Sequence, residues 1–183
     1  MTKLSGEVIC VATHPTHAFS KTPTQQIELI KGMGVAGDAH CGETVKHRSR
    51  VAANPHQPNL RQVHLFTAEM LDEVLAQGFA VKPAELGENI TTRGLDLINL
   101  PLGTQLQIGR ETLVELTGLR NPCKQIDRFQ KGLMQAVLGR DENDQLLLRA
   151  GVMAIVLKSG SVRTGDTITA KLPALPHTKL ERV

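Results

Sequence analysis

The sequence contains no tryptophan and no tyrosine, and phenylalanine occurs only four times among its 183 residues. Proteins that bind single-stranded nucleic acid without sequence preference stack the bases on aromatic side chains, and this chain has almost none. The net charge of +3 is small for a protein that binds a phosphate backbone, although it suits a small anionic ligand. The composition therefore argues against nucleic acid as a partner.

The chain also lacks long apolar runs, and its first residues show no charged and apolar regions of a secretion signal. Its three cysteines, Cys10, Cys41 and Cys123, show no spacing typical of a disulfide framework. We therefore expect a soluble cytoplasmic protein with reduced thiols and no membrane partner. The length predicts a single domain with a core at about 7–172 and a loosely held tail at 173–183.

Short apolar segments separated by glycine-containing turns dominate the sequence. Helices are predicted at about 67–77, between Thr67 as its cap and Gly78, and at 128–138, between Asp127 as its cap and Gly139. The segment 158–163 is predicted to be a turn. Strands are predicted at 7–12, 25–31, 62–66, 105–108, 112–117, 152–157 and 167–170. Because strands outnumber helices, we expect a mainly β, barrel-like fold.

A glycine-rich turn follows the second predicted strand. Gly32, Gly34 and Gly37 form the pattern G-x-G-x-x-G, which opens a helix in dinucleotide-binding proteins. No helical period follows here, so we reject that interpretation. Two alternatives remain: a plain connection between a strand and a loop, or a turn whose amides line a pocket with Asp38 and His40 at its end.

The polar segment 40–59 is long for a connection without secondary structure, and it predicts either a mobile lid or a functional loop. A zinc site is disfavoured there, because Cys41, His47, His56 and His64 do not form the close pairs of structural zinc sites. The histidines and arginines of this region are more typical of a basic loop, either solvated or reaching over an anion.

The segment Arg120-Asn121-Pro122-Cys123-Lys124 places one thiol beside two cations. Cationic neighbours and a helix N-terminus stabilise a thiolate, which is the form that reacts and binds metals. The alternative is a buried structural cysteine. A second polar motif, Leu86–Thr91, carries Asn89 in an apolar segment, where it either ties loops together or binds a ligand.

Three motifs in this order resemble the MOSC domain, which is named after the C-terminal domain of molybdenum-cofactor sulfurase, and in particular its stand-alone, YiiM-like members. They are Gly34–His40, Leu86–Gly94, and Pro101–Gly103 continuing through Leu116 to Arg120–Cys123. The resemblance extends roughly from Glu7 to Leu172. It implies a mainly β, barrel-like fold and a functional cysteine at Cys123.

The resemblance further implies that Cys123 carries sulfur as a persulfide or binds the molybdenum of a pterin cofactor. We expect Arg120 and Lys124 to hold the thiolate. The residues expected to complete the cofactor pocket are Arg120, Lys124, Asn89, Arg93, Gly37, Asp38 and His40.

Two activities remain open at this point. The protein either reduces N-hydroxylated compounds, with electrons from a partner reductase, or it is a non-catalytic module that carries sulfur or cofactor to a partner enzyme. Sulfur would come from a cysteine desulfurase-like donor, and any pyridoxal phosphate would belong to that partner.

Overall fold

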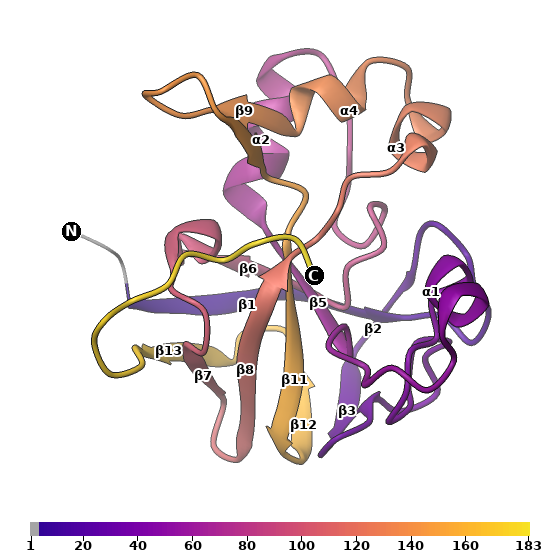
Figure 1. The fold of residues 1–183 in the computed structure, drawn as a ribbon, viewed down its shortest axis with the longest axis vertical. Coiled ribbons are helices and arrows are strands. Elements are labelled where there is room, and N and C mark those ends of the chain that lie inside the picture. Colours follow the sequence, from indigo (N-terminus) through magenta and orange to yellow (C-terminus); the bar gives the residue numbers. More distant parts are fainter. Residues whose placement is uncertain (1–3) are drawn as a thin grey trace.

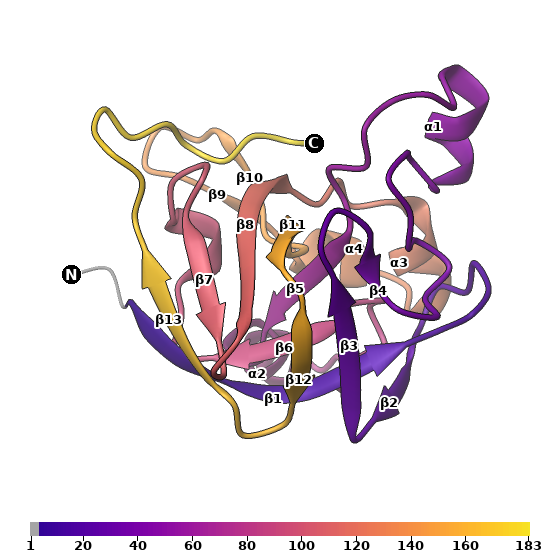
Figure 2. The same ribbon diagram turned by 90° about the horizontal axis from the view of Figure 1, so that it is seen from below.

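The computed structural model describes residues 4–183. Its main feature is a closed β-barrel, in which β13 pairs with β1 to complete the ring (Figures 1 and 2). In order around the ring the strands are β1 (Ser5–Thr13), β13 (Thr167–Lys171), β7 (Gln105–Ile108), β8 (Thr112–Leu119), β11 (Val152–Lys158), β5 (Val63–Thr67) and β6 (Ile90–Arg93). All neighbours are antiparallel except β5 and β6. The prediction of a mainly β, barrel-like fold is confirmed.

The barrel core consists of aliphatic side chains that alternate with outward-facing polar ones. In β7, Leu106 and Ile108 are buried while Gln105 and Gln107 are partly exposed. This period of two is the one that strand geometry imposes. Within residues 4–183, the core cluster contains no aromatic side chain, so branched aliphatic residues such as Leu65 fill the barrel.

A smaller sheet packs its apolar residues into the same core. It consists of β12 (Gly160–Arg163), β3 (Gln26–Ile30) and β4 (Gly34–Val35), and β2 (Thr22–Thr24) pairs separately with the end of β1. The predicted turn at 158–163 is therefore wrong, because residues 160–163 pair with β3. The glycine-rich turn connects β3 to β4 and opens no helix.

A second apolar cluster holds the helical part of the chain against one end of the barrel (Figure 1). Phe66 on β5 packs there with residues of α2 (Ala68–Ala76), α3 (Lys124–Phe129) and α4 (Leu133–Ala136). The hairpin of β9 (Leu138–Arg140) and β10 (Leu146–Leu148) follows, and the short 3-10 helix η1 (Leu97–Asn99) lies after β6. No helix within residues 4–183 has the length and apolar character needed to cross a membrane.

The first predicted helix is confirmed as α2, which begins after Thr67 and connects the parallel strands β5 and β6. The second predicted helix is wrong. Instead of one helix at 128–138, α3 begins at Lys124, and Gly132, with a φ of 89°, separates it from α4. Asp127 lies inside α3, and its carboxylate accepts a hydrogen bond from the Met134 amide near the start of α4.

The last residues of the chain are held against the barrel, in contrast to the loosely held tail that we expected. The Leu119 amide donates to the Glu181 carbonyl, and the Val183 amide donates back to the Leu119 carbonyl. Leu180 is buried. Sequence composition did not reveal this docking because the tail pairs with a strand some sixty residues away.

The polar segment 40–59 forms a closed loop that contains the short helix α1 (Arg48–Ala53). Its two ends meet at a bridge between Thr44 and Pro58, and the Asn59 amide group donates to the carbonyls of His40 and Gly42. None of the residues of α1 is buried. Figure 2 shows α1 standing away from the barrel.

Candidate functional site

A cavity of about 590 Å³ lies between the barrel, the loop that carries α1, and the segment that leads into α3. This volume lies in the range of small-molecule sites. The ionisable side chains in its wall are His17, Lys21, His40, His47, Arg48, Arg50, Arg61, His64, Arg120, Cys123 and Arg182. In the described part of the chain, no Asp or Glu lines it. The cavity is therefore suited to an anionic ligand.

Cys123 lies in the wall of this cavity and is partly exposed. It follows the extended segment Arg120–Pro122 and immediately precedes α3, and its thiol donates a hydrogen bond of 3.5 Å to the Gln125 side-chain oxygen. The alternative of a buried structural cysteine does not describe this position. Cys123 is reachable from the cavity and can serve as a nucleophile or a metal ligand.

The other two cysteines do not line the cavity. Burial raises the pKa of the Cys10 thiol, and the nearby carboxylate of Glu88 raises it further. Burial likewise raises the pKa of Cys41, with a smaller contribution from Asp38. Both therefore remain protonated thiols at neutral pH.

Arg120 joins the two motifs that the sequence singled out. Its guanidinium donates a 2.7 Å hydrogen bond to the Leu86 carbonyl and lies 6.0 Å from the centre of the Phe19 ring. Burial lowers the pKa of Arg120, while the charges of Cys123 and Glu88 oppose that shift. Arg120 and Cys123 thus line the same cavity.

The turn at Leu86 needs a glycine next to it. Gly87 has a φ of 86°, and a Cβ atom there would lie 2.5 Å from the Phe19 carbonyl oxygen. Any other residue would combine an unfavourable backbone conformation with a clash against main chain. This close approach brings the Phe19 segment beside the Arg120 segment at the cavity.

Asp38 is buried next to the cavity and binds two residues of its wall, Lys21 and His40. Its side chain is only 2% exposed and forms an ion pair of 2.5 Å with Lys21, which is 4% exposed. Burial alone would raise the pKa of Asp38, but the hydrogen bond from His40 and the charge of Lys21 together hold that pKa well below its usual range. Burial lowers the pKa of Lys21, and the charge of Asp38 opposes this. Each charge keeps the other ionised inside the protein.

His40 is oriented by the same carboxylate. The His40 amide and the ring Nδ1 both lie within hydrogen-bond distance of Asp38 Oδ1, at 2.9 and 3.2 Å. A carboxylate can only accept, so the Nδ1 of His40 carries the proton. The ring is partly exposed and lines the cavity. Of the predicted pocket-lining turn, only His40 reaches the cavity wall, because none of residues 32–38 lines the cavity.

Asn89 ties three segments together. Its side-chain oxygen accepts from the His64 amide, and its amide group donates to the Ala12 carbonyl and to Asp38. It is 3% exposed and also contributes to the cavity wall. The loop-tying interpretation of Asn89 therefore holds, and its position beside Asp38 places it at the cavity as well.

Five arginines of the cavity wall have no Asp or Glu side chain as an ion-pair partner within residues 4–183. They are Arg48, Arg50, Arg61, Arg120 and Arg182. Burial, with smaller contributions from the charges of Arg50, Arg120 and Arg182, lowers the pKa of Arg61 to about 10. The Nε and Nη2 of Arg61 donate to the main-chain oxygen of Val183. An anion in the cavity would reduce the repulsion among these cations.

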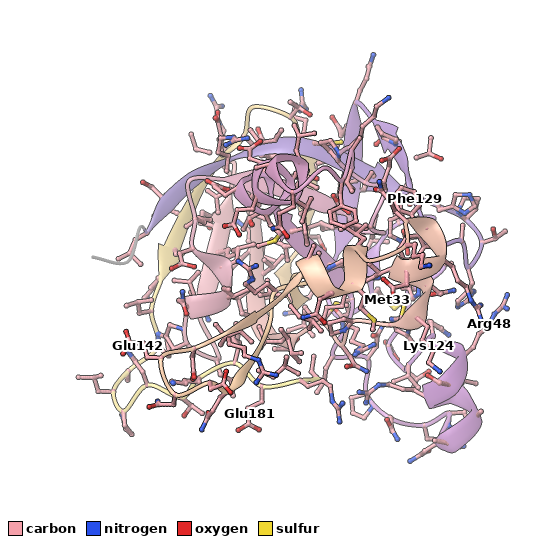
Figure 3. The ribbon with its side chains drawn as sticks, turned by 90° about the horizontal axis from the view of Figure 1, so that it is seen from above. Met33, Arg48, Lys124, Phe129, Glu142 and Glu181 are labelled. Atoms are coloured by element: carbon pink, nitrogen blue, oxygen red, sulfur yellow. The ribbon has the colours of Figure 1, made fainter. Side chains whose placement is uncertain are left out.

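Asp38 is buried and does not line the cavity, and three further residues predicted for the pocket also lie outside it. Arg93, at the end of β6, forms an exposed ion pair of 2.8 Å with Asp72. Lys124 is exposed at the start of α3, on the same side of the molecule as Arg48 and Phe129 (Figure 3), but it does not line the cavity. Gly37 shapes the turn before Asp38 with a φ of 75° and is exposed. The expectation that these three residues complete the pocket is not met.

Other residues of the site were not anticipated. Lys21, His17 and Arg182 come from segments without a recognisable motif, and only the fold brings them to the cavity. The arginines of the polar loop carried a partial signal, since its charge predicted a basic loop that reaches over an anion. Arg48 and Arg50 do line the cavity.

Among residues 4–183, no group of three or more His, Cys, Asp or Glu side chains is arranged to hold a metal ion. A metal in this cavity would need most of its ligands from elsewhere. A cofactor that brings its own metal ligands meets this condition, with Cys123 as the protein's contribution.

Comparison with known proteins agrees with the fold and the motifs. The family model of the MOSC domain matches residues 52–169. The chain is similar to the YuaD protein from Bacillus subtilis, with a TM-score of 0.74 and 24% identity over 95% of this chain and 100% of that one.

YiiM proteins are also similar in structure. YiiM from Escherichia coli has a TM-score of 0.63 and 20% identity over 96% of this chain and 73% of that one. YiiM from Geobacillus stearothermophilus has a TM-score of 0.63 and 16% identity over 94% of this chain and 77% of that one. No curated protein sequence matches the chain. At these identities the solved structures support the fold, and the family model carries the assignment.

Proposed function

The chain belongs to the MOSC domain family, and from this premise we propose that its cavity binds a molybdenum-pterin cofactor, with the Cys123 sulfur as a ligand of the metal. One observation carries the proposal: a reachable thiol and five arginines that have no Asp or Glu partner within residues 4–183 share one cavity. A cofactor that combines a thiol-binding metal with an anionic phosphate needs both features.

The residues present fit this group chemically. Thiolate is a soft donor of the kind that heavier transition metals accept. The planar guanidinium groups of Arg48, Arg50 and Arg61 suit a phosphate, which they can bind in a bidentate manner. Lys21 and Asp38 are already paired with each other and would support the site from beneath.

When bound, the metal would supply two-electron redox chemistry, as the reduction of an N-hydroxylated compound requires. The protein's own residues would orient the ligand and exclude water from the thiol. The electrons would come from a partner reductase, because the thiols of this chain form no cluster that could store them.

A second function is supported by the exposure of Cys123. A reachable thiolate can attack the outer sulfur of a persulfide on a cysteine desulfurase-like donor and take that sulfur over, while the donor thiol leaves. The protein would then carry the sulfur to an acceptor enzyme without catalysis of its own. Any pyridoxal phosphate would remain on the donor.

Elemental analysis and intact mass of the purified protein test both functions. We expect molybdenum and pterin to copurify with the wild type and to be lost in Cys123→Ser, while Cys41→Ser, a matched thiol outside the cavity, retains them. If the protein is the carrier instead, incubation with a sulfur donor adds the mass of one sulfur to the wild type and none to Cys123→Ser. Equal molybdenum and equal sulfur loading in wild type and Cys123→Ser would contradict both proposals.

A further inference from the structure

Three histidines meet in the cavity wall, and the proposed chemistry at Cys123 uses none of them. The ring of His40 lies 5.1 Å from that of His17 and 4.6 Å from that of His47, measured between ring centres. His17 comes from the segment before β2, whereas His40 and His47 both belong to the polar segment 40–59, and the closed loop of that segment brings their rings together. All three line the same cavity as the unpaired arginines.

Two of these imidazoles have fixed partners. His40 is held by Asp38 through its Nδ1, and the ring Nε2 of His17 lies 2.7 Å from the Lys46 carbonyl oxygen. His47 differs from them. It occupies the position before α1, and its side chain makes no capping hydrogen bond there. Its half-buried ring is thus free to accept or release a proton.

The charges that face His47 are nearly all positive. Burial, with smaller contributions from His40, Arg61, Arg120 and Arg50, lowers the pKa of His47 to about 3. Arg48, Arg182 and Lys21 line the same cavity, as does Cys123. The carboxylate of Asp38 is already engaged by Lys21 and His40. At neutral pH the imidazole of His47 is therefore neutral.

An anion changes this balance. A dianion seated among the arginines offsets the repulsion that these cations add to the effect of burial, and it adds an attractive charge of its own. We propose that anion binding in this cavity is coupled to proton uptake, with His47 as the group that receives the proton. The coupling rests on the anion-binding part of the proposed function and needs no chemistry at Cys123.

Linkage fixes the direction of the effect. If the bound state holds more protons than the free state, the affinity for the anion rises as the pH falls. The limit is about tenfold per pH unit for one proton per anion. The cavity would then load an anionic ligand more tightly in acid and release it more readily in alkali.

Sulfate is the probe of choice, because it stays a dianion from pH 5.5 to pH 7.5 and any pH dependence belongs to the protein. Titration calorimetry at pH 6, in two buffers of different ionisation enthalpy, counts the protons taken up with each sulfate. We expect net uptake by the wild type, together with an affinity that rises several-fold from pH 7.5 to pH 5.5.

His47→Asn should still bind sulfate but lose most of the proton uptake and of the pH dependence. His56→Asn is the matched control, since His56 is exposed on the same loop and does not line the cavity, and it should behave as the wild type. Thermal unfolding confirms that each variant is folded, and His47→Gln provides a second test if the asparagine variant is not.

Wild type that binds no sulfate, or binds it with an enthalpy that does not depend on the buffer, would overturn the proposal. So would unchanged proton uptake in a folded His47 variant. The coupling is measured with sulfate on the wild-type thiol, so a failed molybdenum or sulfur assay leaves this result unaffected.

Discussion

Two sets of charged residues lie at the cavity. The charges of one set are paired with each other, and those of the other set are not. Beneath the cavity, Lys21 and Asp38 are almost inaccessible and paired with each other, and Asn89 adds a further hydrogen bond to Asp38. In the wall, the five arginines have no Asp or Glu partner within residues 4–183.

This difference indicates that the paired residues stabilise the fold and the unpaired ones bind a ligand. A buried charge without a partner is strongly unfavourable, so both members of the Lys21–Asp38 pair must be present in the folded protein. A partly exposed arginine keeps much of its hydration, so its charge is tolerated without a partner until a ligand binds. The paired group should therefore matter for stability, and the unpaired group for binding.

Asp38→Asn tests the paired group and should have the largest effect. It leaves the ammonium of Lys21 buried without its counter-charge, which typically costs about 3–5 kcal/mol of unfolding free energy. Urea unfolding at pH 7 measures this. Asp72→Asn is the matched control, because Asp72 forms an exposed ion pair with Arg93, and it should cost less than about 1 kcal/mol.

The same pair predicts how stability depends on pH. The pKa of Asp38 is lower in the folded protein than its usual value of 3.8, so the unfolded chain takes up the proton first as the pH falls. The contribution of Asp38 is complete above about pH 4 and is lost below it. The stability difference between wild type and Asp38→Asn should shrink on acidification. A difference that is constant down to pH 3 would contradict the ion-pair interpretation.

Replacing Arg48 and Arg50 together by alanine tests the unpaired group. Neither residue has a carboxylate partner and α1 contains no buried residue, so the unfolding free energy should change by no more than about 0.5 kcal/mol. Sulfate affinity should fall about tenfold or more, because two charge-assisted hydrogen bonds are lost. Arg110→Ala, at an exposed position away from this cavity, should leave that affinity unchanged. A large loss of stability would show that these arginines are structural.

Replacement of Glu88 should have a small effect on stability, in contrast to replacement of Asp38. It is completely buried, one carboxyl oxygen has no partner, and burial raises its pKa. Because the folded pKa is the higher one, the contribution of Glu88 to stability declines as the pH rises from its ordinary pKa towards the raised one. Glu88→Gln should therefore change the unfolding free energy by less than about 1 kcal/mol at pH 5. At pH 8 the variant should be more stable, relative to the wild type, than it is at pH 5. A loss as large as that of Asp38→Asn would mean that Glu88 is ionised in the fold.

The predictions from sequence succeeded where local patterns decide the outcome. Alternating residues at 105–108 became β7, and the motif around Cys123 placed a reachable thiol at the cavity. The predictions failed where the outcome depends on the direction in which a side chain points. Arg93 lies only four residues after Asn89, yet it points towards Asp72 on α2 rather than into the cavity. Spacing along the chain does not show which face a side chain takes when a strand ends.

By itself, the sequence determined most of the barrel strands, the turns that require glycine, and the family to which the chain belongs, because these depend on neighbouring residues and on motifs that stay together along the chain. Only the tertiary structure decided which charges are paired and which are left for a ligand. Lys21, before β2, and Asp38, after β4, meet only in the fold, while Arg50, Arg61 and Arg182 gather from distant segments without an Asp or Glu in the cavity wall that the structure describes. Coulomb interactions depend on distance in space, and the order of residues along the chain does not contain that distance.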